Sequence, residues 1–463
     1  MPGQGPSSSD FATTPIFRPA ARRNHATTQA TGLKRVLVYG MNYAPEVTGV
    51  GRYTAELAEH LAAIGADVTV ITTPAHYPVW RVEKPFTNTR YAVEVRNNVR
   101  VVRCPLFLHK KMSGFWRLVA PLTFAATSTP AAILQTLHRR PDTIICVEPT
   151  LFVTPVALVL SKLFAARSVL YVQDLEVDAA FAVGHLRNRR WMKVIGSILE
   201  RCTLPFFDRI VTISNSMAEK IRQKGVAPAR IAMIRNWVDL DRFHPISGAS
   251  SYRKSLNYDA SDFVVLYSGS IGAKQELNVL LDAARLLASE SKIKFVVAGE
   301  GPAKESLMRA YKDLTNVKFL PFQPDDSLNA FLSFPDIHAL TQSHSANDLV
   351  LPSKLGGMLA SGKRILVTAN VGTELADFLG ARAIVTPPGD PAELAAAILA
   401  ARSETTDLFE QQRLALARTL SKEEGLRAFC AYIGVGNELT EETSGAGTSS
   451  ALASTPEPRI SNA

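Results

Sequence analysis

The sequence predicts an α/β protein built from two doubly wound, Rossmann-like domains that face a cleft. Short segments rich in β-branched residues alternate with segments of helical periodicity, which is typical of parallel sheets covered by helices on both faces. The alternation starts again after Pro245. The 463 residues suffice for two or three domains, and the hydrophobic fraction of 46% is enough for large cores.

The first alternation supplies five expected strands, at 34–39, 67–72, 143–147, 168–173 and 209–213. Helical periodicity separates them. In the first helix, expected at 51–64, Leu57, Leu61 and Ile64 form one apolar stripe. A second helical segment covers 156–164.

The second alternation supplies six expected strands, at 263–268, 293–298, 317–320, 336–339, 364–368 and 383–385. Helices are expected at 276–288 and 304–312. The resulting division is a disordered tail at 1–32, a first domain at 33–235, a second domain at 236–415, a C-terminal helix within 416–436 that can cross back to the first domain, and a disordered tail at 437–463.

The positive charge belongs to the expected folded part. The net charge is +9, the two tails carry +2 and −3, and residues 33–436 therefore carry +10. Such a surface attracts nucleotide phosphates, anionic lipid or nucleic acid. No run of Lys and Arg is interleaved with aromatic residues, so a nucleic-acid partner is not expected.

The sequence favours a cytoplasmic protein. Its four cysteines lie far apart without a CxxC pair, which disfavours a structural zinc site or a disulfide framework. No apolar core follows the basic residues of the N-terminus, and no uninterrupted apolar run reaches about 18 residues. We therefore expect neither a secretory signal nor a transmembrane helix.

One segment, Phe115 to Leu137, has a composition compatible with the surface of the inner membrane. It is largely apolar, and basic residues flank it: Lys110 and Lys111 before, Arg139 and Arg140 after. An apolar face among the headgroups with these cations on anionic lipid is one interpretation. An ordinary buried pair of helices is the other.

Gly49 and Gly51 occupy the loop between the first expected strand and its helix. Glycine permits close approach of a ligand, and the free N–H groups of a helix N-terminus bind anions. The spacing is not GxGxxG and no acidic residue ends the second strand, so a dinucleotide is disfavoured. A plain glycine turn is the alternative.

Two glycine-rich loops follow strands of the second domain. In YSGSIGAKQ, Gly272 and Lys274 precede a helix, where a lysine beside free N–H groups suits a diphosphate. A solvated lysine is the alternative. In VVAGEGP, Gly299 and Gly301 form a tight turn that either admits a nucleobase or ribose or only reverses the chain.

The stretch SHSANDLVLPSKLGGMLASGKRILVTANVGTELAD combines polar residues with an apolar, glycine-rich background. Asp348, Ser353 and Lys354 precede Gly356 and Gly357. Glu374 begins the helix after the next strand. Because Pro352 suits the first turn of a helix, Lys354 is expected one turn into that helix, near phosphates held at its start. Packing alone is the alternative.

Strand ends of the first domain add polar candidates. Glu148 and Asp174 each follow a strand, where a carboxylate can bind sugar hydroxyls, stabilise positive charge at an anomeric carbon, or cap the next helix. His76 and Tyr77 follow the strand DVTVIT and form either a sugar-stacking lip or a loop anchor.

The chain resembles glycosyltransferase family 4, and within it the colanic acid biosynthesis glycosyltransferases of the WcaI type. The resemblance is carried by VYGMNYAPEVTGVGRYTAELAEHLA, YVQDLEVDAA, IRNWVDLDRFHP, VVLYSGSIGAKQ and DLVLPSKLGGMLASG, which spread over residues 33 to 400.

The resemblance implies a GT-B fold and transfer of a sugar from a nucleotide diphosphate with retention of configuration and without a metal or other cofactor. It implies that Lys274 and Lys354 neutralise the leaving diphosphate, that Asp348 and Ser353 flank the donor sugar and phosphates, and that Gly49 and Gly51 face the phosphates across the cleft. Further candidates for binding the donor are Gly272, Gly299, Gly301 and Glu374. It further suggests fucose from GDP-fucose and a lipid-linked oligosaccharide acceptor.

The chain also departs from the wider family pattern. Gly357 stands where the family has the second of two glutamates, Ser270 replaces an arginine before the phosphate lysine, and Val147 replaces a histidine. These changes concern the contacts to the ribose and the sugar. The competing function class is an epimerase or binding protein of the same fold, which would use acid/base pairs in the cleft instead of phosphate-directed lysines.

Overall fold

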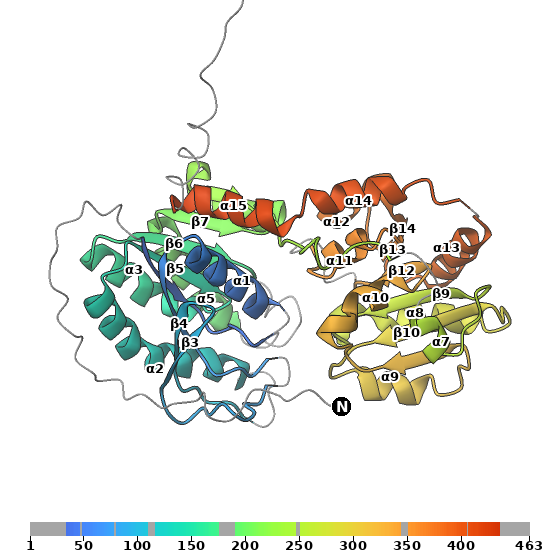
Figure 1. Cartoon of the computed structure of the whole chain (residues 1–463), viewed down its shortest axis with the longest axis horizontal. Helices are drawn as coiled ribbons and strands as arrows, with labels where there is room; N and C mark the ends of the chain where they lie inside the picture. Colours follow the sequence, from blue (N-terminus) through green and yellow to red (C-terminus); the bar gives the residue numbers. More distant parts are fainter. Residues whose placement is uncertain are drawn as a thin grey trace, which may run out of the picture.

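The computed structural model describes residues 34–46, 49–77, 80–109, 116–175, 190–246, 251–343, 351–404 and 406–435. These residues form two α/β domains side by side, each around its own sheet (Figure 1). The prediction of two doubly wound domains is confirmed. The expected tails at 1–32 and 437–463 lie outside the described residues.

The first sheet has the strand order β3-β4-β2-β1-β5-β6-β7-β8. Its strands are β1 (Arg35–Tyr39), β2 (Asp67–Thr72), β3 (Ala92–Arg96), β4 (Val99–Arg103), β5 (Thr143–Glu148), β6 (Arg167–Val172), β7 (Arg209–Thr212) and β8 (Ile231–Met233). Every pairing is parallel except the edge hairpin of β3 and β4.

The second sheet has the order β11-β10-β9-β12-β13-β14 and is entirely parallel. Its strands are β9 (Phe263–Ser268), β10 (Ile293–Ala298), β11 (Val317–Leu320), β12 (Ile337–Leu340), β13 (Arg364–Thr368) and β14 (Ile384–Thr386).

Helices cover both sheets. In the first half of the chain they are α1 (Val50–Ala63), α2 (Trp116–Arg139), α3 (Thr154–Leu163), α5 (Arg190–Thr203) and α6 (Asn215–Gln223). In the second half they are α7 (Ser251–Ser255), α8 (Leu277–Leu286), α9 (Lys304–Ala310), α10 (Leu328–Ser333), α11 (Leu355–Ala360), α12 (Glu374–Leu379), α13 (Pro391–Ser403), α14 (Glu410–Arg418) and α15 (Lys422–Ile433).

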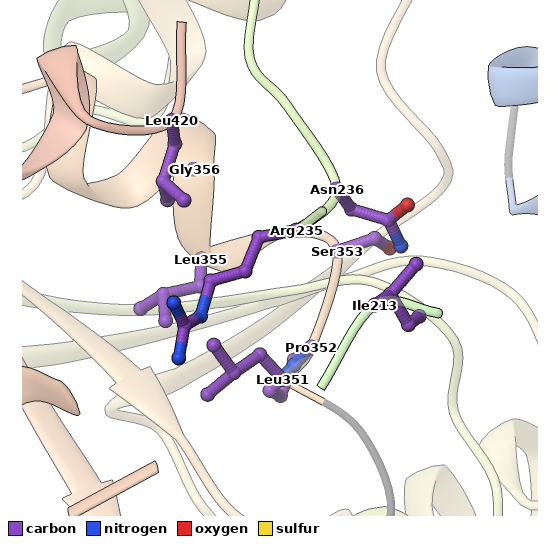
Figure 2. A pocket seen from close by; sticks show the side chains of 9 residues that line it. All are labelled: Ile213, Arg235, Asn236, Leu351, Pro352, Ser353, Leu355, Gly356 and Leu420. Atoms are coloured by element: carbon purple, nitrogen blue, oxygen red, sulfur yellow. The ribbon is translucent and has the colours of Figure 1, made fainter. Parts of the chain in front are cut away.

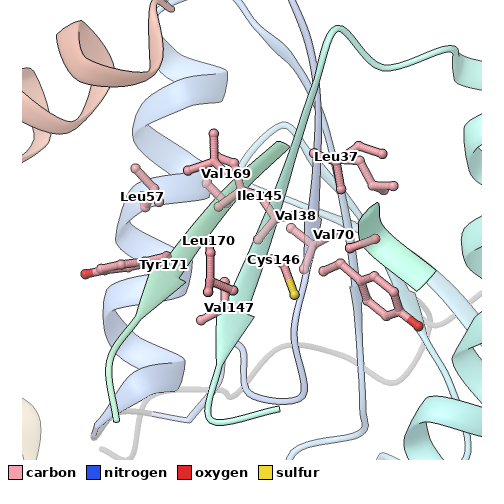
Figure 3. Close-up of a cluster of buried hydrophobic side chains, with 14 of the residues drawn as sticks. Leu37, Val38, Leu57, Val70, Ile145, Cys146, Val147, Val169, Leu170 and Tyr171 are labelled. Carbon is pink, nitrogen blue, oxygen red and sulfur yellow. The ribbon is translucent and has the colours of Figure 1, made fainter. Parts of the chain in front are cut away.

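The core of the first domain explains why its strands are continuous apolar runs. Ile145 and Cys146 on β5 are neighbours in sequence and point to opposite faces of the sheet, yet both are fully buried (Figure 3). Helices cover both faces of the sheet. A strand that alternated apolar and polar residues would therefore bury its polar side chains in one of the two cores.

The described part of the chain crosses between the domains twice, and the two crossings are bonded to each other. The backbone N–H of Val238 donates to the carbonyl of Leu420 (2.8 Å), and that of Lys422 donates to the carbonyl of Val238 (2.9 Å). After the second crossing, α15 packs on the first sheet. Phe429 lies edge-on to Tyr171, with 4.9 Å between ring centroids. Helix α15 thus belongs to the core of the first domain.

The segment with membrane-like composition forms most of α2, a single helix that continues through Pro121 and Pro130. Phe124 and Ala132 are fully buried against the sheet. Among the described residues, no helix is long and apolar enough to cross a membrane.

Candidate functional site

The carboxyl edge of the second sheet carries two loops that are bonded along their backbones. The N–H of Gly269 donates to the carbonyl of Ala298 (2.9 Å), and the N–H of Ile271 donates to that of Glu300 (2.9 Å). A Cβ on Gly299 would stand 1.8 Å from the carbonyl oxygen of Gly269. The loops can therefore meet only because this residue is a glycine.

Gly301, two residues further along the same loop, also allows the two loops to approach each other closely. A Cβ there would stand 2.1 Å from the carbonyl oxygen of Ile271. The structure thus gives Gly299 and Gly301 a definite role in joining the two loops. Their predicted contact with the nucleotide stays a prediction.

Lys354 reaches this pair of loops from the N-cap of α11. Its Nζ lies 3.8 Å from the centroid of the Tyr267 ring, and a Cβ on Gly269 would stand 3.3 Å from it. The expectation that Lys354 lies one turn into a helix is wrong. Leu355 donates its N–H to Pro352 in a turn, and the helix begins only at Leu355.

The Nζ of Lys354 is buried and has no hydrogen-bond acceptor among the described residues. Burial lowers the pKa of Lys354 from 10.5 to about 7, because a desolvated ammonium without an anionic partner is unfavourable. An anion placed here would restore the charged form, since opposite charge raises the pKa of a lysine.

Lys274 lies in the same loop system, in the short 3-10 helix Ala273–Gln275. Its side chain is exposed, and its carbonyl accepts a hydrogen bond from the N–H of Ser343 (2.9 Å). The N–H of Gly272 donates to the side chain of Gln275 (3.1 Å). The structure therefore brings Lys354 to the loop that carries Lys274. Asp348 lies within 344–350, outside the described residues.

A small pocket joins the two domains next to Ser353, which is exposed (Figure 2). It is lined by Ile213, Arg235, Asn236, Leu351, Pro352, Ser353, Leu355, Gly356 and Leu420. Arg235 and Asn236 were not predicted as site residues. Each has a buried polar atom, Nε and Oδ1 respectively, that finds no hydrogen-bond partner within the described part of the chain. They follow β8, a strand of three residues that the apolar pattern does not predict, so the strand end that marks the other candidates gives no signal here.

Glu374, the first residue of α12, directs its carboxylate at the first domain. It accepts hydrogen bonds from the backbone N–H groups of Asn215 (3.1 Å) and Ser216 (3.0 Å) and from Nη2 of Arg235 (3.1 Å). These contacts show where the carboxylate points. The predicted contact of Glu374 with the donor is not among them.

In the first domain, Gly51 makes room for Glu46, a buried residue that sequence reasoning missed. A Cβ on Gly51 would stand 2.8 Å from Cβ of Glu46. Oε1 of Glu46 accepts the backbone N–H groups of His76 and Tyr77, both at 3.1 Å. Gly49 has a φ of +62°. A Cβ added there would lie 3.9 Å from Cε1 of the Tyr77 ring.

The imidazole of His76 is buried and held by acceptors. Its Nδ1 lies 3.1 Å from the carbonyl of Pro74, 3.2 Å from Oγ1 of Thr73 and 3.5 Å from Oε1 of Glu46. These neighbours favour a proton on Nδ1, which leaves Nε2 as the acceptor in the neutral ring. Nε2 has no hydrogen-bond partner among the described residues.

The remaining candidates lie on the same edge of the first sheet. Glu148 is buried at the end of β5, and Asp174 is partly exposed just after β6. The N–H of Gln173 donates to the carbonyl of Glu148 (3.3 Å), which joins the two loops. Within the described ranges, no three His, Cys, Asp or Glu side chains gather closely enough to hold a metal ion.

Comparison with protein families matches residues 48–237 to the glycosyl transferase 4-like domain and residues 262–403 to glycosyl transferases group 1. The chain is 38% identical over 408 residues to an Escherichia coli (strain K12) protein named "Putative colanic acid biosynthesis glycosyl transferase WcaI". The match covers 85% of this chain and 98% of the relative.

Solved structures share the fold at low sequence identity. Sucrose-phosphate synthase from Thermosynechococcus elongatus matches with a TM-score of 0.65 and 16% identity, over 89% of this chain and 100% of that one. Anabaena HepE in complex with UDP matches with a TM-score of 0.61 and 16% identity, over the same shares of the two chains.

Proposed function

The chain belongs to glycosyltransferase family 4 and has the GT-B fold, and we propose that it is a retaining enzyme that transfers a sugar from a nucleotide diphosphate to a lipid-linked exopolysaccharide unit. The observation that carries the proposal is the buried Nζ of Lys354, which has no hydrogen-bond acceptor among the described residues. A diphosphate would supply the missing acceptors and the missing negative charge.

The groups around Lys354 suit the rest of such a donor. Lys274 lies on the same loop system, and the pocket with Ser353, Arg235 and Asn236 adds donors between the domains. These cations and amides stabilise the negative charge that develops on a leaving diphosphate. We propose that they do so without a metal ion, in which case transfer persists in the presence of a chelator.

The proposed reaction is a front-face displacement. The acceptor hydroxyl oxygen bonds to the anomeric carbon as the bond from that carbon to the diphosphate breaks. A diphosphate oxygen takes the hydroxyl proton, which balances charge and atoms. The acceptor would lie against His76, Tyr77, Glu148 and Asp174, where Nε2 of His76 can accept a hydrogen bond from a sugar hydroxyl.

We propose fucose from GDP-fucose as the donor, on the resemblance to the WcaI-type group. A thermal-shift screen of nucleotides and nucleotide-sugars tests this, because a ligand that binds only the folded state raises Tm. GDP and GDP-fucose are expected to raise Tm more than UDP and its sugars at equal concentration. A larger shift with UDP, the nucleotide bound by the Anabaena structure, would replace the GDP assignment.

The acceptor's lipid carrier would bring the enzyme to the cytoplasmic surface of the inner membrane, and α2 and α3 suit that contact. Residues 118–137 contain no charged side chain, and Leu122, Ile133 and Leu137 on α2 are 41–50% exposed. On α3, Leu163 is 73% exposed. The outward face of α6 in the same domain carries charges instead, such as Glu219 and Arg222.

Flotation with anionic vesicles tests this surface. The protein is expected to float at low salt, and Leu137→Gln combined with Leu163→Gln is expected to reduce the floated fraction severalfold, because less apolar area enters the headgroup region. Leu408→Gln, at a residue 76% exposed in the second domain, serves as the control. Absence of flotation at low salt would remove the membrane contact and leave the fold untouched.

A further inference from the structure

The N-termini of α6 in the first domain and α12 in the second domain meet through one carboxylate. Glu374 takes one main-chain N–H from Asn215 on Oε1 and one from Ser216 on Oε2. Arg235, on the connection between the domains, donates to Oε1 as well. A side chain of the second domain thus occupies the anion-binding end of a helix in the first.

The contact is stronger than an ordinary surface ion pair. The free N–H groups and dipole at the start of α6 favour a carboxylate, and the hydrogen bonds are charge-assisted. The side chains of Glu374 and Arg235 are only 12% and 23% exposed. Arg235 also lies over the ring of Phe378 on α12, 4.8 Å from its centroid, which keeps the guanidinium beside Glu374.

The backbone N–H groups in the first turn of α6 donate hydrogen bonds to acceptors in both domains. Ser214, the N-cap, accepts the N–H of Met217 within the helix (3.1 Å). The N–H groups of Asn215 and Ser216 are left for Glu374. Removal of Glu374 would therefore leave two helix donors of the first domain without this partner, while the helix keeps its own cap.

We propose that Glu374 is an interdomain latch: a positioning residue that sets the angle between the domains and does not bind the donor. The inference rests on the proposed function to the extent that transfer requires both domains around one reaction centre. Arg235 lines the interdomain pocket and donates to Glu374, so the contact that holds the domain angle also borders the pocket.

Glu374→Gln tests the latch, because the neutral amide keeps the size of the side chain and loses its charge. We expect kcat to fall about tenfold and the Kd for GDP to change less than about twofold. The reason is that weaker hydrogen bonds between the domains would disturb the way in which the two domains close around the reactants. Glu290→Gln, which breaks a 2.8 Å ion pair with Arg402, is the matched control and should leave both values unchanged.

The domain angle is measured directly by a distance between spin labels at Cys202 on α5 and at position 396 on α13 after Ala396→Cys, both exposed sites. Glu374→Gln should broaden the distance distribution. This readout needs no substrate, so it tests the latch even if the enzyme uses another donor. An unchanged distribution would overturn the proposal, as would a loss of GDP affinity that matches the loss of kcat.

Asn215→Pro tests the other side of the contact. It removes one N–H that bonds Glu374, at the first residue of α6, where proline is tolerated. The preceding Ser214 is extended, as a residue before proline requires. If Glu374 is the latch, Asn215→Pro should broaden the distance distribution as Glu374→Gln does. The double variant should then show a smaller effect than the sum of the two single effects. Additive effects would contradict it.

Discussion

Lys354→Ala is expected to reduce sugar transfer about a hundred- to a thousandfold while the protein stays folded. The substitution removes the ammonium that the leaving diphosphate would meet, and loss of one preorganised donor of this kind costs about that factor in kcat. Folding should be retained, since Nζ makes no hydrogen bond to the described residues. Transfer is measured by release of the nucleoside diphosphate, and folding by thermal melting.

Lys292→Ala is the control for this variant. Lys292 is an exposed lysine of the same domain that pairs with Asp259 (3.1 Å), and its removal should leave transfer unchanged. Wild-type turnover in a folded Lys354→Ala protein would reject the role of Lys354. Loss of transfer in both variants would point to a general effect of charge.

Gly299→Ala is expected to destabilise the second domain by more than about 3 kcal/mol. A Cβ at this position would overlap the carbonyl oxygen of Gly269, and the φ of +146° is one that alanine rarely adopts. The two loops would have to separate, which moves Gly269 away from the ammonium of Lys354. Urea unfolding measures the loss, and transfer should fall together with stability.

The control separates the close approach from the backbone conformation. Gly389 has a φ of +78°, and no atom lies within 4 Å of an added Cβ. Gly389→Ala should therefore cost about 1 kcal/mol, the strain of the backbone alone. Equal losses in the two variants would show that contact between the loops contributes nothing to stability.

The central strands of both sheets could be predicted from the sequence because they are buried on both faces. β1, β5 and β9 each contain a short continuous run of apolar residues, which is a local signal. The hairpin of β3 and β4 was missed. β3 reads AVEVR at the edge of the sheet, where exposed charged residues dilute the apolar pattern.

The loops after β9 and β10 could also be predicted, since glycine and lysine after a strand are local features. The roles of Glu374 and Arg235 could not. Their mutual contact joins residues 139 positions apart, and the contact of Glu374 with Asn215 joins residues 159 positions apart. Such contacts depend on the domain arrangement, which sequence periodicity does not encode.

Gly51 is a residue for which the sequence suggests a ligand contact and the structure shows a contact within the protein. Its position at a strand-to-helix junction favoured a phosphate contact. The structure shows that its missing side chain admits Glu46, which in turn fixes the loop of His76 and Tyr77. A glycine required by a neighbouring side chain and one required by a ligand leave the same mark in a sequence.

Calorimetry of nucleoside diphosphate binding at pH 8, in two buffers of different ionisation enthalpy, tests the claim that Lys354 meets the diphosphate. With a pKa of about 7, Lys354 is mostly neutral at pH 8 without ligand and should be charged against the diphosphate. We expect uptake of close to one proton per GDP bound, and none in Lys354→Ala. Binding by the wild-type protein without proton uptake, or with the same uptake in both proteins, would contradict the account.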